Sequence, residues 1–202
     1  MSGQTRFHLL RHASYDLLGR VLAGRSGGHS LNAEGRAEAE ALADALAGQP
    51  IVAIASSPLE RARETAAPIA ERHGLAIAID PDLNEIDFGD WTGLAFEALH
   101  ADGTWRRFNA FRSATPIPGG ETMLAAQARA LAAVLRLRSA YPTGEVAVVS
   151  HGDVIKAVLA HFLATPLDLM RRIEISPASR SVLVLEGADA RIEGINLRAP
   201  VR

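Results

Sequence analysis

The chain has no cysteine and only one lysine, Lys156, among its 202 residues. Without cysteine it has no disulfide framework, no thiol nucleophile and no thiolate metal site. All the other residues among its 21 lysines and arginines are arginines. An isolated arginine is therefore weaker evidence for an anion site here than in a chain of average composition.

Strong net charge and long apolar stretches are also missing. The net charge is −2 and the isoelectric point about 6.4, so no general basic character points to nucleic acid. The sequence shows no apolar stretch of membrane length and no secretory signal. We therefore expect a soluble cytoplasmic protein that binds neither nucleic acid nor membranes. Its oligomeric state is left open, with a homodimer as one option.

What the chain does contain is enough apolar sequence for one large core. Hydrophobic residues make up 48% of it, and its length fits a single domain over residues 1–202. The run from Ile51 to Ala55 is continuously apolar, as expected of a strand covered on both faces. Strands are predicted at 6–10, 51–55, 76–79, 146–149, 181–185 and 191–195.

Helical patterns separate these strands. One begins after Asn32, a suitable N-cap, and runs through Leu46. In another, we expect Ser57 to cap the helix, Pro58 to take the first position and Glu60 to complete a capping box. The remaining helices are expected over 121–138 and 154–162. This alternation predicts an α/β fold with a mostly parallel sheet, ending in a hairpin of the last two strands.

The region of about 86–120 differs from the rest in composition. It contains both tryptophans, Phe108, Phe111 and two prolines. Bulky residues in a long loop often line a substrate pocket, so we predict a cap-like insertion over a site rather than an independent domain. A satellite hydrophobic cluster is the alternative, and the two are compatible.

Polar side chains follow the first four predicted strands. They are, in order, Arg11 with His12, Arg61, Glu85 and His151. Parallel strands bring their carboxyl ends to the same edge of a sheet, where ligands bind in open α/β folds. An arginine fork recognises phosphate or carboxylate, and a neutral imidazole can attack phosphorus. Each junction alone fits an ordinary solvated strand end, but four of them together favour a functional site.

The sequence allows two interpretations of the role of Arg61. It is expected in the first turn of its helix, and a helix N-terminus already favours anions. Alternatively, Arg61 pairs with Glu60, Glu64 or another surface acid.

These residues resemble the histidine phosphatase superfamily, which includes the phosphoglycerate mutases. The turn Leu10-Arg11-His12-Ala13 is similar to the Arg-His-Gly signature of that family, and the segment 56–62 is similar to its second signature. The other similar segments are 31–36, 65–66, 83–93, 118–121 and 150–152. They fall in family order and span nearly the whole chain, so their combination is specific although no single one is.

The resemblance implies both a fold and a mechanism. The fold is a three-layer α/β/α sandwich with a mostly parallel central sheet, phosphoglycerate mutase-like, with a small cap insertion. His12 would be the catalytic nucleophile that forms a phosphohistidine, and Glu85 the catalytic acid and base. Arg11, Arg61 and His151 would bind the phosphoryl group. No metal and no cofactor are implied.

The chemistry of these residues agrees with the implied roles. Phosphoryl transfer needs in-line groups and positive charge around the equatorial oxygens, which two guanidiniums and an imidazole can supply. Glu85 can protonate a departing alkoxide and then accept a proton from the attacking water, which contributes about 10²–10⁴-fold. His12 must be neutral to attack, whereas a protonated His151 would help to bind phosphate.

Two departures from the family pattern affect the expected phosphate site. Ala13 replaces the usual glycine, so a methyl group must fit beside the phosphate. Where the family often carries Thr and Asn, this chain offers Ser14, Tyr15, Asp16 and then Leu18. Asp16 would repel a dianion if it faced inward, and Ser14 or Arg25 are candidates to compensate.

Phosphatases and mutases of this family share the first half of the reaction. Mutases resemble one another in having Arg or Lys directly after the Glu that corresponds to Glu85, whereas this chain has Ile86. We therefore expect a metal-independent phosphomonoesterase that acts on a small phosphorylated metabolite through a phosphohistidine. A phosphoglycerate mutase-type phosphomutase and a non-catalytic phosphate-binding module are the alternatives.

The remaining candidate residues are expected to be structural or exposed. This applies to His8, His29, His73, His100 and His161, which show no metal-ligand clustering. The segment 119–121 is predicted to start a helix rather than to contribute chemistry.

Overall fold

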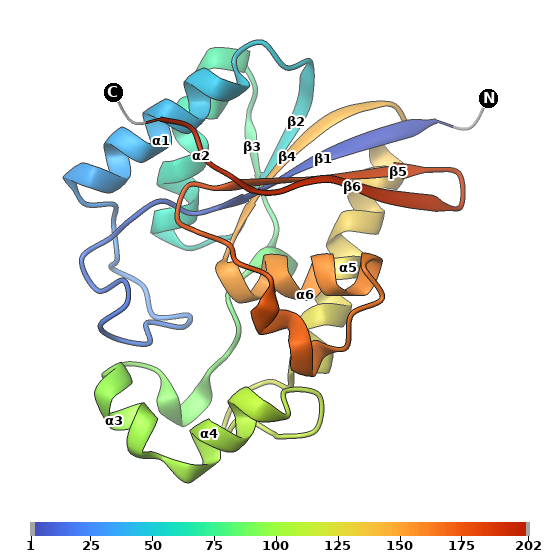
Figure 1. The fold of residues 1–202 in the computed structure, drawn as a ribbon. Helices are drawn as coiled ribbons and strands as arrows, with labels where there is room; N and C mark the ends of the chain where they lie inside the picture. Colours follow the sequence, from blue (N-terminus) through green and yellow to red (C-terminus); the bar gives the residue numbers. More distant parts are fainter. Residues whose placement is uncertain (1–2, 201–202) are drawn as a thin grey trace.

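Six strands form one sheet in the order β3-β2-β4-β1-β5-β6 in the computed structural model, which describes residues 3–200 (Figure 1). The strands are β1 (Gln4–Arg11), β2 (Ile51–Ser56), β3 (Ile77–Ile79), β4 (Gly144–Ser150), β5 (Arg180–Glu186) and β6 (Asp189–Leu197). The first four run parallel to one another, while β5 and β6 form the predicted antiparallel hairpin. The mostly parallel sheet is confirmed. Residues 1–2 and 201–202 of the domain predicted over 1–202 lie outside the described part.

Helices cover both faces of the sheet, which confirms the three-layer α/β/α arrangement. On one face lie α1 (Ala33–Leu46) and α2 (Glu60–His73), and on the other α5 (Met123–Ala140) and α6 (Gly152–Phe162) (Figure 1). The strands serve both layers because their side chains alternate. Val146 and Val148 of β4 join the core under α5 and α6, whereas Ala147 and Val149 join the core under α1 and α2.

The N-termini of the helices match the sequence only in part. Asn32 caps α1 as predicted, because its side chain accepts a hydrogen bond from the Gly35 N–H at 2.8 Å. The capping box predicted for α2 is wrong. That helix begins at Glu60 after Leu59, which makes no side-chain cap. The Ser57 hydroxyl accepts a long hydrogen bond from the Leu59 N–H at 3.4 Å but lies closer, at 2.7 Å, to His151 Nε2. The Ser57 N–H donates to the Val149 carbonyl oxygen rather than to Glu60, so the reciprocal bond of the box is missing.

The start of α5 is also later than predicted. Thr122 caps the helix by accepting a hydrogen bond from the Ala125 N–H at 3.1 Å, and Met123 is its first residue. The segment 119–121 therefore does not start the helix. Gly120 instead lies so close to the preceding loop that a Cβ there would come within 2.3 Å of the Asp87 carbonyl oxygen.

The region 86–120 forms two short helices, α3 (Phe96–Ala101) and α4 (Gly103–Ala110), which lie together away from α1 and α2 (Figure 1). Its aromatic rings pack on one another, with the Trp91 and Trp105 centroids 5.2 Å apart and those of Trp91 and Phe108 5.4 Å apart. These rings belong to the same buried cluster as β1 and β4. The cap residues are thus continuous with the main core rather than a separate cluster.

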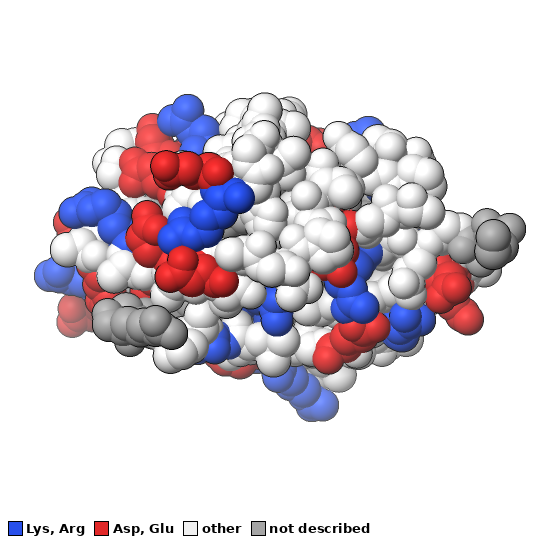
Figure 2. All heavy atoms as spheres, turned by 90° about the horizontal axis from the view of Figure 1, so that it is seen from above, with Lys and Arg blue, Asp and Glu red and all other residues white. Residues whose placement is uncertain are grey.

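Three 3-10 helices complete the structure: η1 (Pro81–Leu83), η2 (Gly89–Trp91) and η3 (Leu167–Arg172). Within residues 3–200, none of the helices combines the length and apolarity that a bilayer crossing requires. Acidic and basic side chains are interspersed on the face that Figure 2 shows. Ion pairs also form between helices: Arg72 of α2 binds the carboxylates of Glu40 and Asp44 in α1 at 2.8 and 2.7 Å.

We predict that Gly35→Ala destabilises the protein by about 1–3 kcal/mol, because overpacking forces the backbone apart. The added Cβ would lie 1.9 Å from the Ser14 carbonyl oxygen, on the loop that follows β1. Gly48→Ala is the matched control, since a Cβ there meets nothing within 4 Å. Chemical denaturation of the three proteins measures the difference. Equal losses in the two variants would contradict close packing of α1 on this loop.

Candidate active site

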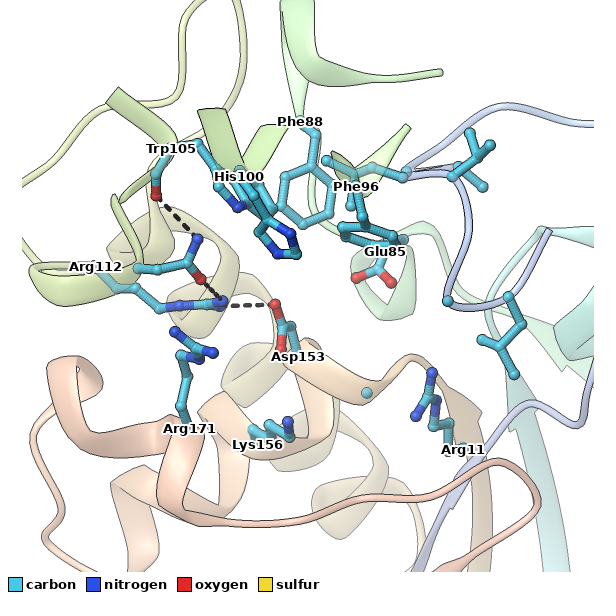
Figure 3. A pocket seen from close by; sticks show the side chains of 18 of the residues that line it. Arg11, Glu85, Phe88, Phe96, His100, Trp105, Arg112, Asp153, Lys156 and Arg171 are labelled. Atoms are coloured by element: carbon cyan, nitrogen blue, oxygen red, sulfur yellow. Dashed lines mark hydrogen bonds and ion pairs between the residues drawn. The ribbon is translucent and has the colours of Figure 1, made fainter. Parts of the chain in front are cut away.

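A cavity of about 670 Å³ opens at the carboxyl ends of the parallel strands, beneath the cap (Figure 3). Four of the five predicted site residues line it: Arg11, His12, Arg61 and Glu85. The fifth, His151, is completely buried beside them, with its ring centroid 5.2 Å from that of His12. The structure therefore brings all five together from four different strand ends.

His12 has one ring nitrogen engaged by the main chain. Its Nδ1 lies 2.8 Å from the carbonyl oxygen of Ala13. A carbonyl only accepts hydrogen bonds, so Nδ1 carries the proton and Nε2 keeps its lone pair. Burial, together with the charges of Arg11 and Arg61, lowers the pKa of His12 well below its ordinary value. The imidazole is therefore neutral and nucleophilic at physiological pH.

His151 is held from behind by Ser57. Its Nε2 lies 2.7 Å from the Ser57 hydroxyl, and its Nδ1 lies 3.8 Å from a carboxylate oxygen of Glu85. Burial, and next the neighbouring His12, lower the pKa of His151 well below its ordinary value. The expected protonated His151 is thus disfavoured in this structure. When Ser57 donates to Nε2, the neutral ring still presents an Nδ1–H toward the site.

Glu85 lies in an environment that favours its protonated form. Burial, and next the charge of Asp153, raise the pKa of Glu85 to about 7. A carboxyl group with a pKa near neutrality can both give and take a proton at physiological pH. Its main chain is fixed as well, because Arg25 and Arg129 donate hydrogen bonds to the Glu85 carbonyl oxygen at 2.8 and 3.0 Å.

Glu121 connects the residues that hold this acid loop. Its carboxylate accepts hydrogen bonds from Arg25 at 2.8 Å, from Arg129 at 2.7 Å and from the Asp87 N–H at 2.9 Å. The prediction that 119–121 serves only to start a helix is therefore wrong. Glu121 positions the loop that carries Glu85.

Arg61 does not pair with a surface acid. Its side chain is only 1% exposed, and one nitrogen donates to the Gly24 carbonyl oxygen at 2.8 Å. The guanidinium also lies 5.3 Å from the centre of the Tyr15 ring. Its Nε and Nη1 have no partner among the residues that the structure describes. Unpaired buried donors are costly, so this arginine is suited to bind an anion.

Arg11 has a similar arrangement. One nitrogen donates to the Ile175 carbonyl oxygen at 2.7 Å, while the buried Nε has no partner in the described part of the chain. The guanidinium lies against Gly152 at the start of α6, where a Cβ would come 3.3 Å from Nε. Arg11 and Arg61 together supply several donors that an oxyanion can accept from.

The two departures from the family pattern have structural answers. Ala13 packs in the core beneath α1 and α2, and its N–H donates to the Thr65 hydroxyl at 2.9 Å, so its methyl group lies away from the cavity. Asp16 is exposed and does not line the cavity. The suggested compensation is wrong, because neither Ser14 nor Arg25 lines it.

One of the other histidines lies near the site. His100, expected to be structural or exposed, is exposed and also lines the cavity from α3. His8 is buried, and its Nε2 lies 2.7 Å from Glu145. Across residues 3–200 there is no group of three or more His, Asp or Glu side chains that could hold a metal ion.

Several cavity residues were not found from the sequence. Arg112 of the cap is buried and binds Asp153 at 2.7 Å, and Lys156 and Arg171 lie on the same side of the cavity (Figure 3). Asp153 had a signal, because it follows His151 at the start of a helix. The others had none, since their positions depend on how the cap and η3 pack around α6.

Comparisons with known proteins agree with this geometry. The family model of the histidine phosphatase superfamily (branch 1) matches residues 7–198. The glucosyl-3-phosphoglycerate phosphatase of Mycobacterium tuberculosis is 33% identical over 172 residues, which are 80% of this chain and 77% of that protein.

Two solved structures are similar along nearly their whole length. The native structure of a mycobacterial glucosyl-3-phosphoglycerate phosphatase has a TM-score of 0.85 at 30% identity, covering 96% of this chain and 99% of that one. Bacillus stearothermophilus YhfR has a TM-score of 0.92 at 26% identity, covering 98% of this chain and all of its own (100%). These matches confirm the predicted family and fold.

The raised pKa of Glu85 predicts a pH-dependent effect on stability. In the unfolded chain this group ionises near its ordinary pKa of 4.5, but in the fold near 7. The folded state therefore binds the extra proton, and the stability that this group contributes falls as pH rises from about 4.5 to about 7. Glu85→Gln removes that loss. We expect the variant to be more stable by roughly 1–3 kcal/mol above pH 7 and nearly unchanged at pH 4.5.

Thermal unfolding at several pH values measures this effect, and a kcal/mol corresponds to about 2–4 °C for a chain of this size. Asp16→Asn, on the exposed loop, controls for the loss of one negative charge. A constant difference between Glu85→Gln and the parent at all pH values would contradict the raised pKa.

Proposed function

The chain belongs to the histidine phosphatase superfamily and is a phosphoric monoester hydrolase, and we propose that it cleaves a small phosphorylated metabolite through a phosphohistidine on His12. The observation that carries this proposal is the neutral, oriented imidazole of His12, on which the charges of the buried Arg61 and the partly buried Arg11 act. Its Nε2 is the free nucleophile, and the arginines supply the charge that the transferring group requires.

In the first step, Nε2 of His12 attacks the phosphorus atom of the substrate. The bond from phosphorus to the ester oxygen breaks, and Arg11, Arg61 and the Nδ1–H of His151 bind the phosphoryl oxygens. Glu85, protonated because its pKa is about 7, gives its proton to the departing alkoxide. The products of this step are a free alcohol and phosphohistidine.

In the second step, water attacks the phosphohistidine. The Glu85 carboxylate left by the first step accepts a proton from that water, so the same group acts as acid and then as base. The bond between His12 and phosphorus breaks, and phosphate leaves with the imidazole neutral again. The two arginines provide positive charge for both steps without a metal ion or cofactor.

The residue after Glu85 favours hydrolysis over transfer to a second phosphorylated substrate. Ile86 is completely buried in the main core, so this position offers no cation to hold another anionic group. The similar mycobacterial enzyme is named for a phosphatase activity on glucosyl-3-phosphoglycerate, a small metabolite. A cavity of about 670 Å³ fits a ligand of that size range.

We further propose that the protein acts in the cytoplasm on its small substrate and binds neither nucleic acid nor membranes. The interspersed charges of Figure 2 support the second part of this proposal, because they form no basic patch on that face that could attract nucleic acid or anionic lipid.

We predict that His12→Ala abolishes hydrolysis of both p-nitrophenyl phosphate and an alkyl phosphate, and that EDTA leaves the parent's activity intact. Glu85→Gln should lower alkyl phosphate turnover by about 10²–10⁴-fold. Its effect on p-nitrophenyl phosphate should be smaller, since p-nitrophenolate leaves without a proton. His73→Ala, at the far end of α2, controls for loss of a histidine elsewhere.

Acid-labile labelling by a ³²P-phosphorylated substrate, present in the parent and missing in His12→Ala, identifies the intermediate. Turnover that survives in His12→Ala would refute the nucleophile.

The pKa of Glu85 also predicts a pH profile. The first step needs Glu85 protonated, so kcat/KM for an alkyl phosphate should fall as pH rises through about 7, with a slope approaching −1. This fall in kcat/KM above pH 7 should be smaller for p-nitrophenyl phosphate, because its leaving group needs no acid. Initial rates across pH 5–9 at constant ionic strength measure it. If kcat/KM of Glu85→Gln fell with pH in the same way as that of the parent, the ionisation would belong to another group.

A further inference from the structure

The cavity is wider than a phosphoryl group requires, and its far wall is cationic. Beyond Arg11 and Arg61 it is lined by Arg106 and Arg112 of the cap, Lys156 of α6 and Arg171 of η3. Glu85 and Asp153 are its only acidic lining residues in the described part of the chain. Figure 3 shows Arg112, Lys156 and Arg171 grouped around Asp153, on the opposite side of the cavity from Arg11.

Two of these cations form no close ion pair within residues 3–200, although the charge of Lys156, after that of Arg112, helps to lower the pKa of Asp153. Arg112 binds Asp153 at 2.7 Å and Asn109 at 2.9 Å, and Arg106 donates to carbonyl oxygens within the cap. Lys156 and Arg171 form neither an ion pair nor a side-chain hydrogen bond within residues 3–200.

The lack of an ion pair does not by itself distinguish these cations, because the exposed Arg63 and Arg172 form none within residues 3–200 either. Their place distinguishes them. Together with Arg106 and Arg112 they put four cations on one wall of the cavity, where Asp153 is the acidic lining residue in the described part of the chain. The wall thus has an excess of positive charge, which an anionic group of a ligand would offset.

The position of Lys156 relates this wall to the reaction centre. Gly152 lies against the Arg11 guanidinium, and Lys156 follows one helical turn later in α6. The helix rise separates their Cα atoms by roughly 6 Å along its axis. A compact molecule can thus place a phosphoryl group at Arg11 and a second group beside Lys156. Asp153 also lines the cavity and can accept hydrogen bonds from hydroxyl groups of the ligand.

We propose that Lys156 and Arg171 bind a second anionic group of the substrate, which is therefore a phosphomonoester that also carries a carboxylate or another phosphate. This inference rests on the proposed phosphatase function for the first group but concerns a different part of the cavity. The buried Ile86 cannot serve this purpose, so the second group is recognised from α6 and η3 instead.

Binding of non-hydrolysable phosphonates tests this without turnover. Isothermal titration calorimetry compares alkylphosphonates with ω-phosphonocarboxylates of the same chain length, over a series of lengths. At the best length the added carboxylate should lower Kd by at least about tenfold, as expected for a charged hydrogen bond. Alkane bisphosphonates in the same series show whether phosphate or carboxylate is preferred. The preference should weaken with added salt.

Substitutions assign the preference to the two cations. In Lys156→Gln/Arg171→Gln, the Kd of the alkylphosphonate divided by the Kd of the phosphonocarboxylate should fall toward one. Arg171→Lys should keep a higher ratio than Arg171→Gln. Arg172→Gln is the matched control, because Arg172 neighbours Arg171 in η3 but does not line the cavity. If the double variant does not fold, Arg171→Gln alone, on the exposed surface of η3, carries the comparison.

The outcomes separate the two proposals. Equal affinity of the parent for both ligand series, or a preference that survives in the double variant, would overturn the second anion site. Failure of the parent to hydrolyse any phosphomonoester, with the binding preference intact, would overturn the proposed hydrolysis and leave this site standing.

Discussion

The parallel register of β1 against β4 is the constraint on which the site depends. Arg11 pairs with Ser150 across the two strands, so His12 and His151 leave the sheet side by side. The His12 N–H continues the ladder by donating to the Ser150 carbonyl oxygen at 3.0 Å, and the Ser57 N–H donates to Val149 at 2.9 Å from the other side of β4. A shift of one residue would turn every side chain to the opposite face and separate the two imidazoles. Because the alternating residues of β4 are buried in two different cores, that shift is prevented by packing rather than by the site itself.

Burial then gives the assembled groups their chemistry. The same desolvation lowers the pKa of His12 and raises the pKa of Glu85, since it disfavours the charged form of each. A base becomes a neutral nucleophile while an acid keeps its proton, both near neutral pH. The arginines cannot lose their charge in this way. Among residues 3–200, Arg61 is instead left with unpaired donors, which makes the free site less stable than the same site with an anion bound.

The features that the sequence predicts correctly are those set by neighbouring residues. Continuous apolar runs predict the central strands, and Asn32 is correctly predicted to cap α1, because neither feature depends on distant residues. All five predicted site residues lie together because the topology of a parallel sheet fixes where strand ends meet. The wrong predictions concern side chains that bind residues of distant segments rather than their neighbours in sequence. The Ser57 hydroxyl lies closer to His151 than to the start of α2, and Glu121 joins Arg25 and Arg129 instead of starting α5. The hydrophobic periodicity of the sequence does not indicate such long-range contacts.

The same distinction divides reaction chemistry from substrate choice. The groups proposed to transfer phosphate come from strand ends, which the sheet holds rigidly, and rigid elements position catalytic groups well. The cationic wall comes from α6, η3 and the cap, whose packing depends on side chains such as Arg112 and Asp153. Helix α6 belongs to both parts, because its first residue lies against Arg11, Asp153 follows it, and Lys156 lies one turn further along. A change in the cap can therefore alter which molecule fits, while the helix keeps the distance between the reacting phosphoryl group and the rest of the substrate fixed.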